Sequence, residues 1–213
     1  MFICTHCPGG HCEDIEFTDA PDFCPSIGIS AEEELARYNE EDKSAAHAAA
    51  IVEGRYYKQL TRVEEIMEYA LQRGFDKIGL AFCSGLTAEG KIFVDILRAN
   101  GFKVNAIQCK NGHVGKSAIS IDPADFADKD VPEEIMCNPI GQAEKLDAAG
   151  CQLNVIMGLC VGHDTLFIQH SKAPVTVVAV KDRILGHNPL AAIYNANSYY
   201  SKLYHYVENR KTK

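Results

Sequence analysis

The sequence lacks the features of membrane-spanning, secreted, fibrous and disordered proteins. Its longest apolar runs span only about eight residues, whereas a helix that crosses a bilayer needs roughly 20. Near the N-terminus, Cys4, His6 and Cys7 stand where a signal peptide would have a basic and then an apolar stretch. There is no internal repeat or low-complexity segment, and 46% hydrophobic with 23% charged residues is the composition of an ordinary globular protein. We therefore expect a cytoplasmic protein with no membrane partner.

Positive charge is also scarce in this sequence. The chain has 21 Lys and Arg residues against 29 Asp and Glu residues, a formal net charge of −8, and no basic cluster longer than its last few residues. A protein that neutralises the phosphates of a nucleic acid needs a basic surface. We therefore expect no nucleic-acid partner.

Cysteine, by contrast, is abundant, with nine residues. A reducing cytoplasm argues against a framework of disulfides, and metal binding or catalysis is then the usual reason for so many thiols. Residues 1–29 hold four of the nine and show neither a helical nor a strand period, so this segment cannot fold through burial of its own apolar residues. In a chain of 213 residues we expect a cysteine-rich metal-binding segment over residues 1–29 and one α/β domain over residues 30–213.

Residues 30–74 are predicted to form a helical lead-in to that domain. Ser30 with Glu33, and Thr61 with Glu64, have the spacing of capping boxes, in which each side chain bonds the backbone of the other residue. Further along the chain, helices are predicted after the strands. The predicted helices cover residues 31–39, 42–58, 61–74, 87–99, 139–149, 164–171 and 189–206.

After Gly74, short apolar runs alternate with helical segments, a pattern typical of a parallel, doubly wound α/β sheet. The predicted strands are Lys77–Cys83, Lys103–Cys109, Glu134–Cys137, Leu153–Cys160 and Pro174–Val180. We therefore expect a Rossmann-like, open, mainly parallel five-stranded sheet with helices on both faces. Residues 110–133, between the second and third strands, show no period, and loops of this length are often lids or binding loops.

The first constellation of cysteines has the spacing C-x2-C-x4-C-x11-C. Its members, called the N-terminal set below, are Cys4, Cys7, Cys12 and Cys24. Thiolates two residues apart can clamp one metal from a single turn, and two further cysteines complete a tetrahedral set that suits zinc or a [4Fe–4S] cluster. Pro25 directly after Cys24, as in bacterial ferredoxin sequences, favours the cluster. The alternative is four unrelated thiols. A segment poor in apolar residues would then have no bound metal or cross-link to order it.

A second constellation falls at the last residues of four predicted strands. Its members, called the internal set below, are Cys83, Cys109, Cys137 and Cys160. The carboxyl ends of parallel strands open onto one crevice, where ligands usually bind, so we expect these thiols to converge. Adjacent strands lie about 5 Å apart, which suits a cluster several ångströms across better than a single ion bridging four strands. A free cysteine is also a small core hydrophobe, and Cys151, outside this pattern, is expected to be one.

Polar residues are predicted beside the same crevice. They are His163, Asp164, Lys181, Arg183 and His187. His163 could ligate a metal or act as an acid–base group that Asp164 orients. Lys181 and Arg183 could hold an anionic substrate, and His187 could ligate or carry protons. The alternatives are a helix cap with a surface histidine at the first two positions and a solvated turn at the other three.

These patterns leave three functions open. The first is a metal-binding protein with two four-cysteine sites, iron–sulfur in kind, that performs redox or Lewis-acid chemistry on a small-molecule substrate and exchanges electrons with a redox partner. The second is a zinc-binding structural or metal-handling module without catalysis. The third is a metal-free thiol enzyme with Cys83 or Cys160 as the nucleophile.

Four stretches, together with the N-terminal set, carry a resemblance to a known family. They read GLAFCSGL, CNPIGQA, GLCVGHD and VKDRILGHNP. In this order they resemble a family of cysteine-rich bacterial and archaeal proteins of unknown function that is described as predicted metal-binding. The resemblance implies metal binding through the cysteines and no particular reaction.

A weaker resemblance concerns cluster-binding enzymes. The N-terminal set is similar in spacing to the cubane-binding cysteines of nickel carbon monoxide dehydrogenases. Those enzymes and the hybrid cluster proteins also ligate clusters at strand ends of Rossmann-like domains. This resemblance implies a cluster on the internal set, with His163 or His187 as a further ligand.

Overall fold

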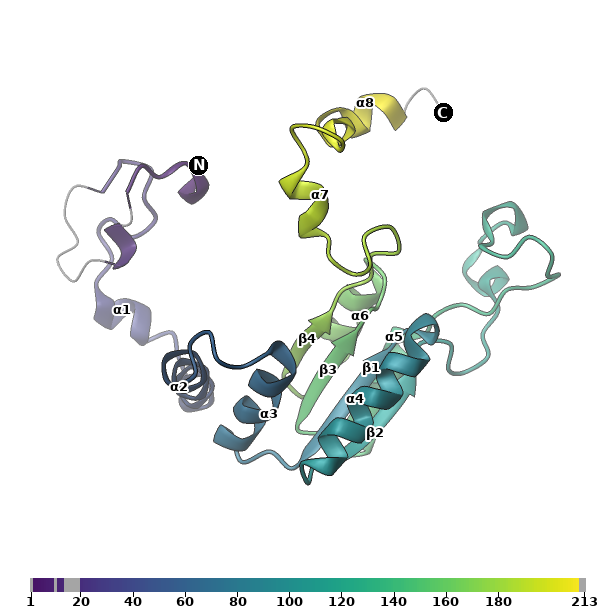
Figure 1. Ribbon diagram of the computed structural model, residues 1–213, viewed down its shortest axis with the longest axis horizontal. Coiled ribbons are helices and arrows are strands. Elements are labelled where there is room, and N and C mark those ends of the chain that lie inside the picture. Colours follow the sequence, from purple (N-terminus) through teal and green to yellow (C-terminus); the bar gives the residue numbers. More distant parts are fainter. Residues whose placement is uncertain (1, 10, 14–19, 211–213) are drawn as a thin grey trace. The chain divides into compact units, whose positions relative to one another are not determined.

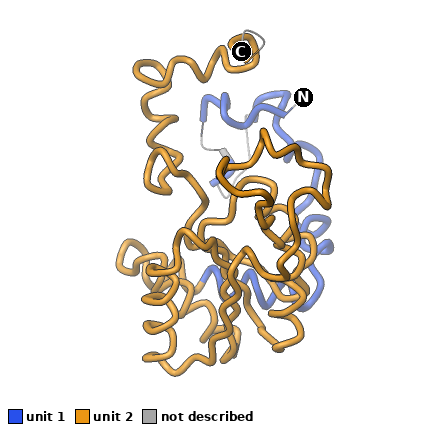
Figure 2. The backbone as a smooth tube through the Cα atoms, turned by 90° about the vertical axis from the view of Figure 1, so that its right-hand side faces the viewer, with its two compact units in different colours: residues 1–50 blue, residues 51–213 orange. Residues whose placement is uncertain are grey.

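The structure, a computed structural model, describes residues 2–9, 11–13 and 20–210. The chain divides into two compact units, unit 1 (residues 1–50) and unit 2 (residues 51–213), with the boundary inside helix α2 (Figure 2). Residues 14–19 of the predicted cysteine-rich segment lie outside the described residues, and the predicted border after residue 29 stays a prediction. Within the described part of the chain, no helix is both long and apolar enough to cross a membrane.

Unit 1 consists of short local elements. They are the 3-10 turns Cys4–His6 and His11–Glu13, helix α1 (Ala31–Leu35) and the larger part of α2 (Glu40–Arg55). The capping box predicted at α1 is confirmed: the N–H of Glu33 donates to Oγ of Ser30 at 3.2 Å, and the N–H of Ser30 donates to Glu33 at 2.9 Å. α1 ends at Leu35, earlier than predicted, because Asn39 and Asp42 exchange hydrogen bonds of 2.9 and 3.2 Å that begin α2 instead.

Unit 2 is built on one four-stranded, all-parallel sheet (Figure 1). Its strands are β1 (Lys77–Phe82), β2 (Lys103–Gln108), β3 (Leu153–Met157) and β4 (Val175–Ala179). Their order is β2-β1-β3-β4, and Gly79 of β1 lies in register with Asn105 on one side and Asn154 on the other. Four of the predicted strands, the parallel sheet and the α/β class are thereby confirmed.

The fifth predicted strand, Glu134–Cys137, is wrong. In the described chain Ile135 makes an isolated antiparallel bridge with Gly115, and the segment joins no sheet. It is tied into the preceding loop instead, where the N–H of Lys116 donates to the carbonyl of Glu134 at 2.9 Å. Four residues are too few for periodicity to separate a strand from an extended loop segment.

Helices cover both faces of the sheet. They are α3 (Arg62–Gln72), α4 (Thr87–Ala99), α5 (Pro139–Ala148) and α6 (His163–His170). Successive residues of β1 point to opposite faces: Leu80 belongs to a core cluster with residues of α3 and α4, whereas Ala81 belongs to a second cluster with residues of α5 and α6. Both residues are fully buried, and burial of a side chain such as Leu80 stabilises the fold by about 2 kcal/mol. The helices therefore pack on the two faces of the sheet through two separate clusters of buried side chains.

Helix ends follow the predicted signals early in unit 2 and depart from them near the C-terminus. The capping box at Thr61 begins α3 as predicted, and Gly74, with a φ of +66°, follows its end. The single helix predicted over residues 189–206 is wrong. The chain forms α7 (Leu190–Tyr194), a 3-10 turn at Ser201–His205 and α8 (Tyr206–Arg210). α7 stops at Asn195, whose side chain donates to the carbonyl of Ala191 at 2.8 Å, a local bond that competes with helix continuation.

Candidate functional site

The internal set of cysteines lines one cavity of about 480 Å³. Its members come from four segments: Cys83 follows β1, Cys109 follows β2, Cys137 precedes α5, and Cys160 lies between β3 and α6. The cavity therefore gathers thiols that are far apart in the sequence.

The cavity lies where the strand order of the sheet reverses. From β1 the chain moves to β2 on one side, whereas β3 pairs with the other side of β1. Ligands of open α/β sheets bind at such a switch point, beyond the carboxyl ends of the strands. The sheet hydrogen bonding continues one residue past β1, because the N–H of Cys83 donates to the carbonyl of Met157 at 3.1 Å. Likewise, the N–H of Cys109 donates to the carbonyl of Phe82 at 2.9 Å, so the sheet fixes both cysteine backbones.

Cys109 is only 2% exposed, and its sulfur is hydrogen-bonded to Ser84. The N–H of Ser84 donates to the sulfur at 3.3 Å, and Oγ of Ser84 lies 3.9 Å from it. The neighbouring thiol of Cys137, then Ser84 and Cys83, lower the pKa of Cys109 although burial opposes this. The thiol of Cys109 and burial raise the pKa of Cys137. The two thiols therefore shift each other's pKa in opposite directions.

Cys160 is paired with a cation. Arg183, which follows β4, donates from Nη2 to the Cys160 sulfur at 3.2 Å. This hydrogen bond and the charge of Cys160 raise the pKa of Arg183, with smaller effects from Cys83 and Cys137. The structure thus fixes a guanidinium at the cavity wall, where it offsets negative charge.

His163 and Lys181 lie close to the internal set. His163 is the first residue of α6 and lines the cavity. Lys181 lies near the turn that follows Cys83, because a Cβ atom built on Gly85 would be 3.8 Å from Nζ of Lys181. His163 could therefore act on a molecule in the cavity, whereas Lys181 is not among the described residues that line it.

Asp164 and His187 bond their own loop segments instead. Asp164 accepts the N–H groups of Gly162 at 3.0 Å and Thr165 at 2.8 Å. Nδ1 of His187 accepts the N–H of Asp182 at 3.1 Å. Neither side chain is among the described residues that line the cavity. These contacts correspond to the helix-cap and turn alternatives that the sequence left open.

The aperiodic loop after β2 forms one wall of the cavity. It contains the 3-10 turns Lys116–Ile119 and Pro123–Asp125. Ile119, Ile121 and Ala127 line the cavity from this loop, so part of the wall is apolar. The loop is therefore placed as the predicted lid or binding loop would be.

Glu134 fastens this loop and is a residue that sequence reasoning missed. Its carboxylate accepts Lys116 Nζ at 2.8 Å, Lys110 Nζ at 3.1 Å and the N–H of Ala127 at 2.7 Å. The side chain is only 12% exposed. The hydrogen bond from Lys116, then that from Lys110, lower the pKa of Glu134 to about 2 against the effect of burial. The residues that bond Glu134 follow no sequence motif. The unusual length of the loop is therefore the one feature of the sequence that could have pointed to Glu134.

The cysteines of the N-terminal set lie in separate turns of unit 1. Cys4 and Cys7 share a 3-10 turn, in which the N–H of Cys7 donates to the carbonyl of Cys4 at 3.1 Å. Cys12 lies in the second turn, and Cys24 lies in a later turn. In neither unit are three Cys, His, Asp or Glu side chains of the described residues close enough together to hold a metal ion as they stand. All nine cysteines are free thiols.

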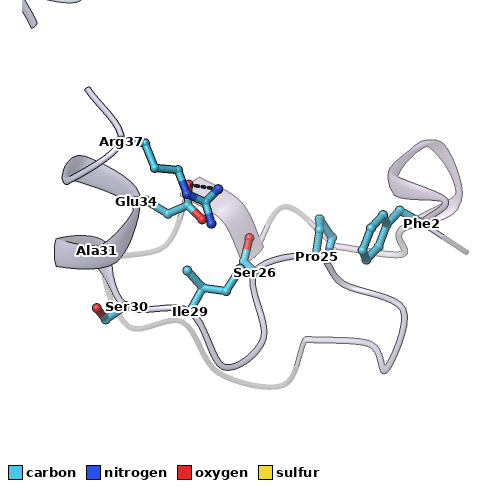
Figure 3. A pocket seen from close by; sticks show the side chains of 8 residues that line it. All are labelled: Phe2, Pro25, Ser26, Ile29, Ser30, Ala31, Glu34 and Arg37. Atoms are coloured by element: carbon cyan, nitrogen blue, oxygen red, sulfur yellow. Dashed lines mark hydrogen bonds and ion pairs between the residues drawn. The ribbon is translucent and has the colours of Figure 1, made fainter. Parts of the chain in front are cut away.

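A second hollow, of about 580 Å³, lies within unit 1 (Figure 3). Its lining residues are Phe2, Pro25, Ser26, Ile29, Ser30, Ala31, Glu34 and Arg37. Figure 3 shows Arg37 turned onto Glu34, and the two charges form an exposed ion pair of 2.9 Å. No thiol lines this hollow, and its charges neutralise each other, so we assign no site to it.

Comparison with known proteins gives a family and no activity. An uncharacterized protein of Methanocaldococcus jannaschii is 45% identical over 163 residues, covering 76% of this chain and 81% of that protein. No solved structure matches the chain. The family model described as "Protein of unknown function (DUF1847)" matches residues 24–178, a range with the whole internal set but only Cys24 of the N-terminal set. The chain therefore belongs to the DUF1847 family of proteins of unknown function.

Proposed function

We propose that this chain is a metal-binding protein whose internal set ligates an iron–sulfur cluster or zinc, and that this centre performs redox or Lewis-acid chemistry on a small molecule. One observation carries the proposal: four thiols from four segments line a single cavity at the switch point of the sheet. Four soft sulfur donors are the ligand set of zinc and of iron–sulfur clusters. The donor chemistry therefore fits a metal centre.

The four thiols line the same cavity but are not arranged as metal ligands. Among the described residues, no three of these side chains are close enough together to hold a metal ion. The sulfur of Cys109 already accepts the N–H of Ser84, the residue after Cys83, at 3.3 Å. The backbones of Cys83 and Cys109 are held by the sheet, and a cysteine side chain can turn between staggered rotamers. A centre on this set would therefore need changes of cysteine rotamers.

The charge around the internal set also supports the proposal. Arg183 contacts Cys160, and Lys181 lies near Gly85, two residues after Cys83. Helices α5 and α6 begin at the cavity, and a helix N-terminus carries a partial positive charge. These groups would offset part of the negative charge of four thiolates.

The chain's own residues would bind and orient the substrate. A cavity of about 480 Å³ is in the usual range for small-molecule sites. Arg183 and Lys181 would hold an anionic group, and His163 would give or take a proton. The loop fastened by Glu134 would limit the access of water. When bound, the centre would supply electron transfer if it is a cluster, or polarisation of an oxygen if it is zinc.

The N-terminal set supplies the second site of the proposal. Residues 2–9, 12–13 and 20–29 include no buried side chain, so this segment has no core and would gain its order from a metal. A [4Fe–4S] cluster here would pass electrons to a redox partner. Zinc here would be structural, and the protein would then be the zinc-binding or metal-handling module that is the alternative function.

Two finer assignments belong to this proposal. We infer a Rossmann-like sheet, because the parallel strands reverse their order between β1 and β3 beside the cavity. We also infer a cytoplasmic location, because nine free thiols persist in a reducing compartment.

The test is metal analysis of protein purified without oxygen. Iron, zinc and acid-labile sulfide per chain are measured together with the visible spectrum. With clusters at both sites we expect a brown protein with about eight irons and matching sulfide. A colourless protein with one or two zinc ions would support the alternative module instead.

Two variants separate the sites. Replacing both Cys83 and Cys160 by Ala should remove the metal of the internal set and leave that of the N-terminal set. Cys151→Ala is the matched control, because Cys151 is a buried cysteine that does not line the cavity. Metal content that is unchanged in the double variant would contradict the proposal.

A further inference from the structure

Two cysteines of the cavity are neighbours in this structure. Cys109 and Cys137 both line it, and the pKa of each is shifted by the other thiol. The backbones are clamped as well, since the N–H of Asn138 donates to the carbonyl of Cys109 at 2.7 Å. Cys137 also packs against the buried cluster that contains Cys109. The backbone therefore brings the two cysteines together, and the rotamers of their side chains decide whether the sulfurs meet.

Both residues line the cavity, but they are so little exposed that only a small reagent can reach them. Cys137 is half-buried, and Cys109 is 2% exposed. Ser84 holds the Cys109 sulfur through its N–H at 3.3 Å, and its hydroxyl lies 3.9 Å away. A sulfur that accepts hydrogen bonds, with a second thiol beside it, is the arrangement in which oxidation of one cysteine is resolved by its neighbour.

We propose that Cys109 and Cys137 form a redox-active dithiol that reduces small hydroperoxides and closes to a disulfide. This dithiol would act in the chain without a metal, so it does not rest on the proposed function. Its nucleophile is neither Cys83 nor Cys160, the two cysteines for which the sequence predicted that role. Cys83 lines the same cavity and precedes Ser84, whose N–H bonds the Cys109 sulfur, so the experiment must separate two partners for the same sulfur.

The reaction has two steps. The Cys109 sulfur attacks one oxygen of the peroxide, the O–O bond breaks, and Cys109 becomes a sulfenic acid while the other oxygen leaves and takes up a proton. The Cys137 sulfur then attacks the Cys109 sulfur. An S–S bond forms, the S–O bond breaks, and the hydroxide leaves as water with the proton of Cys137. Two thiols have lost two electrons, and hydrogen peroxide has become two molecules of water.

The test treats reduced, metal-free full-length protein with one equivalent of hydrogen peroxide, then blocks the remaining thiols and maps the tryptic peptides. Cys83, Cys109 and Cys137 lie in three different tryptic peptides, so the map identifies the linked pair. We expect a peptide pair joined through Cys109 and Cys137, formed about ten-fold or more faster than any oxidation of Cys151. Dithiothreitol should reverse the link.

Two variants sharpen the result. In Cys137→Ser the link should be absent, and a sulfenic-acid reagent such as dimedone should label Cys109. Cys151→Ser is the control and should form the link at the wild-type rate. A link between Cys109 and Cys83, or oxidation of both thiols without any link, would overturn the proposal. Because the peptide map is read without metal, a failure here leaves the metal analysis unaffected, and the reverse also holds.

Discussion

The two sets of cysteines lie in regions that differ in how far buried side chains hold them in place. Unit 2 places the internal set at the edge of a sheet that two buried clusters hold from both faces. Unit 1 has Ala48 as the one buried residue among its described side chains. The thiols of unit 2 are thus positioned by packing, whereas those of unit 1 lie in turns that burial does not hold.

The hydrogen bonds of the two units differ in range. In unit 1, the bonds of Ser30 with Glu33 and the ion pair of Arg37 with Glu34 join residues three apart. Such exposed local pairs contribute about 0–1 kcal/mol each. In unit 2, the side chain of Gln142 donates to the carbonyl of Ile107 at 2.7 Å and so joins α5 to β2. We infer that unit 2 can preorganise its thiols and that unit 1 relies on a bound group.

The largest effect is expected at Gly79, in the middle of the sheet. A Cβ atom here would lie 2.1 Å from Oδ1 of Asn154 and 3.1 Å from Cδ1 of Leu146. Asn154 is fully buried, and its amide donates to Oγ of Ser171 at 2.8 Å, so the side chain has no room to withdraw. We expect Gly79→Ala to lower the free energy of unfolding of unit 2 by about 3 kcal/mol, measured by urea denaturation.

The control for that substitution is Gly54→Ala in α2. A Cβ atom at Gly54 meets nothing within 4 Å, and alanine favours a helix over glycine by up to about 1 kcal/mol. This variant should be as stable as the wild type or slightly more stable. Equal losses in the two variants would contradict the idea that the close packing of β1 and β3 holds the internal set in place.

A smaller effect is expected from Glu134→Gln, which loosens the loop at the cavity wall. The variant loses the ion pairs to Lys110 and Lys116, which are partly buried, so we expect a loss of about 1–2 kcal/mol. Hydrogen exchange of the loop amides at residues 110–136 should be faster. Glu89→Gln, at an exposed position of α4, is the control and should change neither quantity.

Acid gives an independent check on the same carboxylate. The pKa of Glu134 is lowered from 4.5 to about 2 in the folded chain, first by its hydrogen bond with Lys116. A lowered pKa means that the stabilisation is complete above about pH 4.5 and disappears as the pH falls toward 2. The difference in urea midpoint between wild type and Glu134→Gln should shrink over that range. A difference that stays constant down to pH 2 would show that the charge of Glu134 is not its cause.

The sequence is a good guide wherever local spacing decides the structure. The four confirmed strands have apolar runs of their own, and the capping boxes at Ser30 and Thr61 need only residues three apart. The cavity location also follows from the pattern, because the carboxyl ends of parallel strands share one edge of the sheet. Cys137 lines the cavity although its predicted strand is wrong, since the loop before α5 passes the same edge.

What the sequence does not contain are the contacts between distant residues. Glu134 meets Lys110 and Lys116 only because the loop folds back on itself. The proximity of Cys137 and Cys109 depends on a backbone hydrogen bond between two segments that have no shared motif. The break after α7 is a local event, but helical periodicity alone gives no measure of the competing bond from the Asn195 side chain.

The smallest effect on unit 2 is expected from changes in the N-terminal set. Replacing Cys4 and Cys7 by Ser should remove the metal of the N-terminal set and make unit 1 more sensitive to limited proteolysis. The urea transition of unit 2 should stay within about 0.5 kcal/mol of the wild type, because its core clusters contain none of these residues. Zinc or iron retained at the wild-type level would contradict the assignment of this set as ligands. A large loss of stability in unit 2 would contradict the inference that the two units are stabilised independently of each other.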